Sequence, residues 1–180
     1  VYFAGAQFIH VLLGPAVVAL AWPMWQRKDA LLLAWRGLLL AAFLGGAAAV
    51  GSAFVLGKLM GLPLTVLLSM VPKSVTAPVA MGVAQQIGGI PALAAVFAVL
   101  TGMVGAISGK YIFDLFGIKT DKAGWIQRGF ALGTAAHGIG AARAMQVNAD
   151  AGAYAGLALA IQVLLASILI PLAVLLFNVF

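Results

Sequence analysis

The sequence predicts an all-α integral membrane protein built from inverted repeats of transmembrane helices, with two polar-tipped helices that are re-entrant or discontinuous. Two observations predict the membrane class: 64% of the 180 residues are hydrophobic and 8% are charged, and the mean hydropathy is +1.15. A third observation, two polar interruptions within apolar stretches, predicts the broken helices. We therefore expect residues 1–180 to form a single multi-pass transmembrane domain in the inner (cytoplasmic) membrane.

The composition also argues against several classes of function. The chain has no cysteine, so neither disulfides nor thiolate metal sites are available. It has no catalytic motif such as paired carboxylates or a phosphate-binding loop. We therefore expect no enzyme, cofactor or metal site. Ten Lys and Arg residues against four acidic ones give a charge of +6, which we interpret as a signal of membrane topology and not of nucleic-acid binding.

Two spans precede the first interruption. Residues 3–25 and 31–59 are each long enough to cross a hydrocarbon core of ~30 Å. The short connection between them, residues 26–29, is basic and is therefore predicted to be cytoplasmic. The second span is rich in small residues, which favours close packing of helices in lipid.

The first interruption lies within residues 64–88. Its centre, residues 72–78, reads Pro-Lys-Ser-Val-Thr-Ala-Pro. Proline removes a backbone donor and ends or kinks a helix, and in lipid the freed backbone groups must face protein or water. The two apolar arms are about 8 to 10 residues each, or ~12–15 Å as helix. Neither arm can cross the membrane alone.

The second interruption follows a further span at residues 91–116. It occupies residues 129–147, and its centre, residues 133–140, reads Gly-Thr-Ala-Ala-His-Gly-Ile-Gly. A last span is expected at residues 154–177. A second basic connection, residues 119–128, precedes this interruption and is also predicted to be cytoplasmic.

Two topologies fit these elements. If both basic connections are cytoplasmic, the first interruption is a re-entrant hairpin from the outside and residues 125–147 form one from the cytoplasm. Alternatively, both are discontinuous helices that cross fully, which moves residues 119–128 to the outside. We favour the hairpins because they respect the positive-inside rule. Gly61 then corresponds to Gly117, and residues 74–78 correspond to residues 134–138 after a four-residue shift, as in inverted repeats.

The polar tips suggest an anion site. A short helix that follows a tip presents free N–H groups and the positive end of its dipole, which together bind anions. Polar and ionisable side chains lie close to these tips: Lys73, Ser74 and Thr76 at the first, and Thr134, His137 and Arg143 at or after the second. Alternatively, the two cations extend to lipid headgroups and the hydroxyls satisfy broken backbone.

Three segments resemble the LrgB/CidB family of antiholin-like membrane proteins, which includes the plastidial glycolate/glycerate translocator. They are residues 72–78, residues 88–91 (Gly-Gly-Ile-Pro) and residues 128–144, which begin Arg-Gly-Phe-Ala and end Ala-Ala-Arg-Ala. The resemblance extends over nearly the whole chain. Family members usually carry further hydrophobic segments first, so we expect such segments before Val1. Gly82 stands where the family often has an acidic residue.

The resemblance implies a membrane transporter or exporter of small monocarboxylates such as glycolate, glycerate, lactate or pyruvate. Lys73 and Arg143 would neutralise the carboxylate. Hydroxyls would bond the substrate, and His137 would bond it or carry a proton. The predicted substrate site comprises Lys73, Ser74, Thr76, Pro78, Thr134, His137, Gly138 and Arg143. The alternative is an antiholin-like regulator of murein hydrolases and lysis that acts with a small holin-like partner. The small-residue helix faces also suggest a homo-oligomer in the lipid bilayer.

Overall fold

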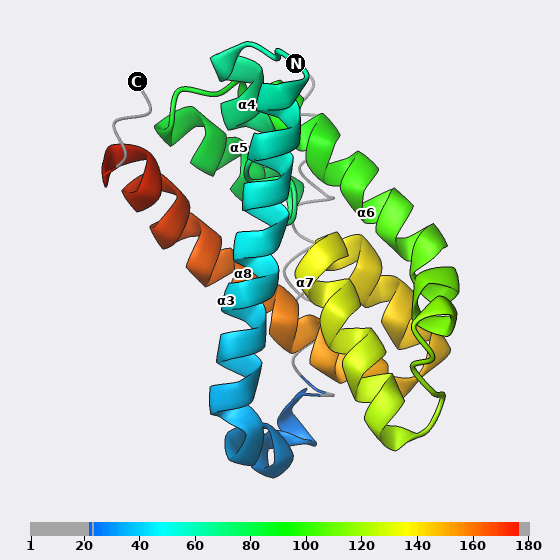
Figure 1. Cartoon of the computed structure of the whole chain (residues 1–180). Coiled ribbons are helices and arrows are strands. Elements are labelled where there is room, and N and C mark those ends of the chain that lie inside the picture. Colours follow the sequence, from blue (N-terminus) through cyan, green and yellow to red (C-terminus); the bar gives the residue numbers. More distant parts are fainter. Residues whose placement is uncertain (1–21, 23, 177–180) are drawn as a thin grey trace, which may run out of the picture.

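The computed structural model describes residue 22 and residues 24–176 of the chain. Within this part all regular structure is helical (Figure 1). The helices are α3 (Lys28–Leu59), α4 (Leu64–Met70), α5 (Ala77–Gln86), α6 (Pro91–Leu115), α7 (Lys122–Val147) and α8 (Ala149–Leu176). Three of them, α3, α6 and α8, are long and apolar enough to cross a membrane. The prediction of an all-helical membrane protein is therefore confirmed, whereas the predicted span at 3–25 lies almost wholly outside the described residues.

The long helices begin and end close to where the sequence predicts. The exception is α8, which begins at Ala149 and not near residue 154. The reason is a cap that we did not predict. Asn148 Oδ1 accepts hydrogen bonds from the backbone N of Asp150 at 2.8 Å and of Ala151 at 3.1 Å. An asparagine that satisfies the first free N–H groups of a helix is a strong start signal.

Helices α3 and α6 end in the same way. Each is followed by a glycine with left-handed backbone, Gly61 at φ +73° and Gly117 at φ +67°, a conformation that favours glycine. In each case the next residue donates a hydrogen bond back into the helix, Leu62 N to Gly57 O and Ile118 N to Phe113 O, both at 3.0 Å. This is the bonding pattern of a Schellman cap. The two glycines that the sequence paired thus occupy equivalent positions.

The first interruption forms two short helices, α4 and α5, joined by residues 71–76. With 7 and 10 residues, these helices are roughly 10 Å and 15 Å long, so neither spans a membrane alone. Ser69 ties α4 to the start of α6. Its hydroxyl donates to Thr65 O at 2.6 Å and accepts from Ile90 N at 2.7 Å. The last turn of α4 is thus bonded to the start of α6, and both short helices lie at one end of the molecule (Figure 1).

The second interruption lies inside α7. Ala136 and His137 have non-helical backbone angles, and the chain reverses there (Figure 1). A Cβ built on Gly140 would lie 2.6 Å from Leu132 O, although eight residues of straight helix would separate these positions by ~12 Å. We call residues 122–135 the first arm of α7 and residues 138–147 its second arm.

The first arm of α7 packs between α6 and α8 through glycines. A Cβ on Gly105 would lie 2.5 Å from Ala136 Cβ, and one on Gly109 would lie 2.8 Å from Leu132 Cδ2. On the other side, Gly133 lies directly against the backbone of Ala155. Small residues allow this close approach of backbones. The position of the reversal is therefore fixed by packing on both sides.

Two ion pairs gather both basic connections at one end of the molecule. Arg27 Nε lies 2.5 Å from Asp150 Oδ1, which joins the start of α3 to the start of α8. Arg128 Nη2 lies 2.7 Å from Asp114 Oδ1, which joins the first arm of α7 to the end of α6. Arg128 is 6% exposed and also donates to Ile118 O. The sequence interpretation counted it as a loop charge and missed this buried pairing.

Candidate functional site

The two polar tips approach each other near the middle of α3. A Cβ built on Gly138, just after the reversal in α7, would lie 3.9 Å from Thr76 Cγ2 at the start of α5. Thr134 lies against α3, where a Cβ on Gly45 would be 2.9 Å from Thr134 Cγ2. Lys73 reaches the same helix and donates from Nζ to Ala49 O at 3.1 Å. Residues far apart in the sequence are thus brought together at one level of the bundle.

Thr134 carries an unpartnered polar atom at this level. The residue is 7% exposed, and its hydroxyl has no hydrogen-bond partner among the described residues. A buried hydroxyl without a partner costs about 1–3 kcal/mol, and most buried polar groups in proteins are bonded. The hydroxyl is therefore a position where a bound polar solute would be favoured.

His137 forms the turn of the second tip. Its φ is +41°, and within the described part of the chain it is the one residue other than glycine that has a positive φ. Such backbone costs about 1–3 kcal/mol and persists only where the surroundings impose it. The imidazole Nε2 lies 2.7 Å from Ala98 O on α6, and a Cβ on Gly102 would lie 2.8 Å from the same atom. Because a carbonyl only accepts, Nε2 carries a proton.

The first tip contributes the charged and hydroxyl groups. Lys73 is half-buried, and an ammonium has three donors, so its bond to Ala49 O does not exhaust its capacity. Ser74 is 8% exposed. Thr76 is the N-cap of α5 but makes no side-chain cap bond. Pro78 lies in the first turn of α5, where its missing N–H costs nothing.

Arg143 lies further along α7 than the other predicted site residues. It lies on the second arm of α7, six residues past His137, which corresponds to roughly 9 Å along a helix. Its side chain is exposed. Of the two predicted cations, Lys73 is the one with a hydrogen bond to α3 at the level of the tips.

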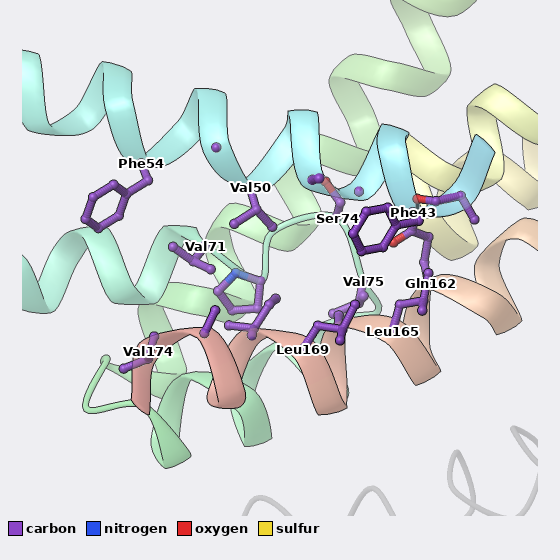
Figure 2. Close-up of a pocket in the computed structure, with 18 of the residues that line it drawn as sticks. Phe43, Val50, Phe54, Val71, Ser74, Val75, Gln162, Leu165, Leu169 and Val174 are labelled. Carbon is purple, nitrogen blue, oxygen red and sulfur yellow. Dashed lines mark hydrogen bonds between the residues drawn. The ribbon is translucent and has the colours of Figure 1, made fainter. Parts of the chain in front are cut away.

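A cavity of about 440 Å³ adjoins the first tip, between α3, residues 71–75 and α8 (Figure 2). Most of its lining is aliphatic or aromatic, with contributions from Phe43, Val50, Val75 and Leu169. Polar side chains come from Ser74 of the tip and Gln162 of α8. The cavity is therefore apolar with a small polar portion, and it is partly open, since Phe43, Gly51 and Ala173 of its lining are exposed.

Gln162 is a residue that the sequence interpretation missed. It is 4% exposed, and its Nε2 donates to Ala42 O on α3 at 2.6 Å. Its approach depends on Gly46, since a Cβ there would lie 2.7 Å from Gln162 Oε1. A single amide in the centre of a 28-residue apolar helix is a signal in itself, because polar residues at membrane depth are expensive.

Similar proteins come from several bacteria. A holin-like protein CidB of Staphylococcus epidermidis is 28% identical over 176 residues, which are 98% of this chain and 75% of the relative. An antiholin-like protein LrgB of Bacillus cereus is 29% identical over 171 residues, 95% of this chain and 73% of the relative. An uncharacterised protein of Haemophilus influenzae is 33% identical over 170 residues, 94% of this chain and 72% of the relative.

The comparison with solved structures found no match. A model of the LrgB-like family, in contrast, matches residues 1–176, nearly the whole chain. The relatives named CidB and LrgB agree with this match. The chain therefore belongs to the LrgB-like family.

Proposed function

We propose that this protein carries small monocarboxylates, such as glycolate, glycerate, lactate or pyruvate, across the membrane. One observation carries the proposal. The polar tips of α4–α5 and α7 approach each other near the middle of α3, where a Cβ on Gly138 would lie 3.9 Å from Thr76 Cγ2 and the hydroxyl of Thr134 has no partner among the described residues. Broken helices that meet at the midplane are the usual construction of a binding site in secondary transporters.

The arrangement of the hairpins supports an inverted repeat. A long helix precedes each hairpin, α3 before α4–α5 and α6 before α7, and both long helices end in the same cap. The hairpins start from opposite ends of the molecule (Figure 1). In this proposal both are re-entrant, α4–α5 from the outside and α7 from the cytoplasm, and both basic connections face the cytoplasm.

The chemistry of the proposed site is that of anion binding. The first turn of α5 and that of the second arm of α7 offer free N–H groups and positive dipole ends. Lys73 supplies the charge, and Thr76 and Thr134 supply hydroxyls for the substrate. His137 holds the second tip in place and bonds the acid or carries its proton. The exposed position of Arg143 leaves Lys73 as the main cation.

Uptake into liposomes tests the proposal. Purified protein is reconstituted and supplied with radiolabelled glycolate, lactate, pyruvate and glycerate, with protein-free liposomes as background. We expect saturable uptake of at least one acid that Lys73→Ala reduces and Lys58→Ala does not. Lys58 is a suitable control because it is exposed in the last turn of α3. Uptake of every acid at the protein-free level would refute the carrier function.

A second function is favoured by the relatives' names, holin-like and antiholin-like. Under this alternative, the protein acts with a small holin-like membrane partner and thereby restrains murein hydrolases. The two functions separate in cells that lack the protein. The Lys73→Ala variant is expressed in these cells, and its transport is measured separately on the purified protein. If the variant restores normal lysis but does not transport, regulation does not depend on the anion site.

The proposed topology has its own test. The chain contains no cysteine, so single cysteines report accessibility without background. Lys28→Cys and Ile90→Cys both replace exposed residues, at the start of α3 and before α6. An impermeant thiol reagent reaches only the outer face of right-side-out vesicles. We expect it to label Ile90→Cys in intact vesicles, and Lys28→Cys only when the inner face is exposed. Labelling of both from one side would rule out the re-entrant hairpin at α4–α5.

A further inference from the structure

The cavity beside the first tip has a polar end and an apolar end (Figure 2). Gln162 and Ser74 lie toward one end, whereas Phe54 and Val174 lie toward the other. The stretch of α8 from Gln162 to Val174 corresponds to roughly 18 Å of helix. Beyond Gln162, the lining side chains of this stretch are all apolar. An occupant that fits this lining has one polar head and an apolar chain.

The size of the cavity exceeds the needs of a two- or three-carbon acid. Its 440 Å³ falls within the ~300–1,000 Å³ that is usual for small-molecule sites, which are likewise mostly apolar with a few polar groups. The volume equals that of about fifteen waters at ~30 Å³ each, whereas lactate has only six non-hydrogen atoms. A longer acid would fill the cavity better.

The depth of the polar end distinguishes such an acid from a lipid chain. Gln162 lies at the centre of the 28 residues of α8, and its partner Ala42 lies near the centre of the 32 residues of α3. A membrane lipid places its polar head at the surface and its chain end at the centre. The cavity has the reverse polarity, with the polar groups central and the apolar lining leading outward.

We propose that this cavity takes the apolar chain of the carried acid, so that the protein prefers monocarboxylates with an aliphatic chain longer than that of lactate. The inference rests on the proposed carrier function. The head group would lie where the first tip adjoins the polar end of the cavity. There Ser74 and the second N–H of the Gln162 amide would add donors to that of Lys73, since only one N–H of the amide is used on Ala42 O. A polyhydroxylated acid such as glycerate would lose hydration of its extra hydroxyl against apolar side chains.

A series of 2-hydroxy acids tests the inference. Glycolate, lactate, 2-hydroxybutanoate, 2-hydroxyhexanoate and glycerate compete with labelled glycolate for uptake into proteoliposomes, with protein-free liposomes as background. Each methylene buried in the cavity should tighten inhibition about fourfold. We expect glycerate to inhibit less well than 2-hydroxybutanoate.

Two matched variants locate the effect. Gly51 lines the cavity, and a Cβ there would meet no described atom within 4 Å, so Gly51→Leu is chosen to narrow the cavity. Gly37 on the same helix is equally open but does not line the cavity, so Gly37→Leu is the control. Gly51→Leu should abolish the advantage of 2-hydroxyhexanoate and change glycolate uptake less than twofold. Ala173→Leu, from α8 across the cavity, serves if Gly51→Leu does not fold.

The outcomes separate the two proposals. Equal inhibition by all 2-hydroxy acids, or the same inhibition pattern in Gly51→Leu and Gly37→Leu, overturns the inference and leaves the carrier function intact. Failure of the wild-type protein to take up any acid overturns the carrier function, and the inference with it. A chain-length preference that Gly51→Leu removes and Gly37→Leu keeps supports both.

Discussion

The two tips reach the same place by different means. The first tip is an irregular stretch of six residues, 71–76, in which Val71, Pro72 and Val75 are buried and Lys73 extends to α3. The second tip consists of two non-helical residues, Ala136 and His137, held by direct packing on glycines of α6. A lysine ammonium can exchange one acceptor for another, whereas packed backbone cannot rearrange without loss of contacts. We infer that the second tip is the scaffold and that the first tip carries, in Lys73, the group that responds to a solute.

The largest effect is expected from a substitution that overpacks the second tip against α6. A Cβ on Gly105 would lie 2.5 Å from Ala136 Cβ, so Gly105→Val should push the second tip away from α6. Overpacking costs typically about 1–3 kcal/mol. We expect a lower melting temperature in detergent and loss of uptake. Gly37→Val, on an open stretch of α3, is the control, and equal melting temperatures of the two variants would contradict the scaffold role.

The next effect concerns the responsive tip. Lys73→Ala should weaken monocarboxylate binding roughly ten- to a hundredfold, since a hydrogen bond to a charged group contributes about 1.5–3 kcal/mol. The melting temperature of the solute-free protein should change little, because the bond to Ala49 O is a single contact at the end of a flexible chain. Isothermal titration in nanodiscs measures the affinity. Wild-type affinity in Lys73→Ala would remove Lys73 from the site.

At Thr134 we expect a smaller effect that weakens acid binding but does not lower the stability of the acid-free protein. Thr134→Val keeps the shape of the side chain and removes its unpartnered hydroxyl. The variant should bind the acid several-fold more weakly, since a neutral hydrogen bond contributes about 0.5–1.5 kcal/mol. Without the acid it should be as stable as the wild type or more stable, because no buried donor remains unsatisfied. A loss of stability with unchanged binding would show that Thr134 is structural.

The smallest effect is expected at Arg143. From the sequence, its guanidinium is a candidate partner for the carboxylate, equal to Lys73. In the structure its side chain is exposed on the second arm of α7, six residues past His137. Arg143→Ala should therefore change affinity less than about twofold, within the range of a surface charge. A loss as large as that of Lys73→Ala would restore Arg143 to the site.

Much of the fold could be predicted because its signals are local. Prolines and a lysine in an apolar run interrupt a helix wherever they occur, and left-handed glycines end helices, so the bounds of α3 and α6 followed from the sequence. The α8 start was misplaced because the cap at Asn148 was overlooked. The convergence of the tips could be inferred only through the argument of repeats and parity.

The parts that could not be predicted depend on contacts between distant segments. Nothing near Arg128 in the sequence indicates that it is buried against Asp114. The reach of Gln162 to Ala42 O depends on the passage of α8 beside Gly46 of α3. The exposure of Arg143 depends on the reversal at two residues of α7. In each case the side chain is ordinary and its position decides its role.

Cross-linking of the two tips tests the central claim most directly. In this cysteine-free chain, Thr76→Cys and Gly138→Cys are combined, because a Cβ on Gly138 would lie 3.9 Å from Thr76 Cγ2. The paired control combines Thr76→Cys with Arg143→Cys, roughly 7 to 8 Å further along the second arm. We predict that mild oxidation in native membranes joins the first pair but not the control, and that a bound monocarboxylate slows the reaction. Failure of the first pair to cross-link, or cross-linking unaffected by every acid, would contradict an anion site between the tips.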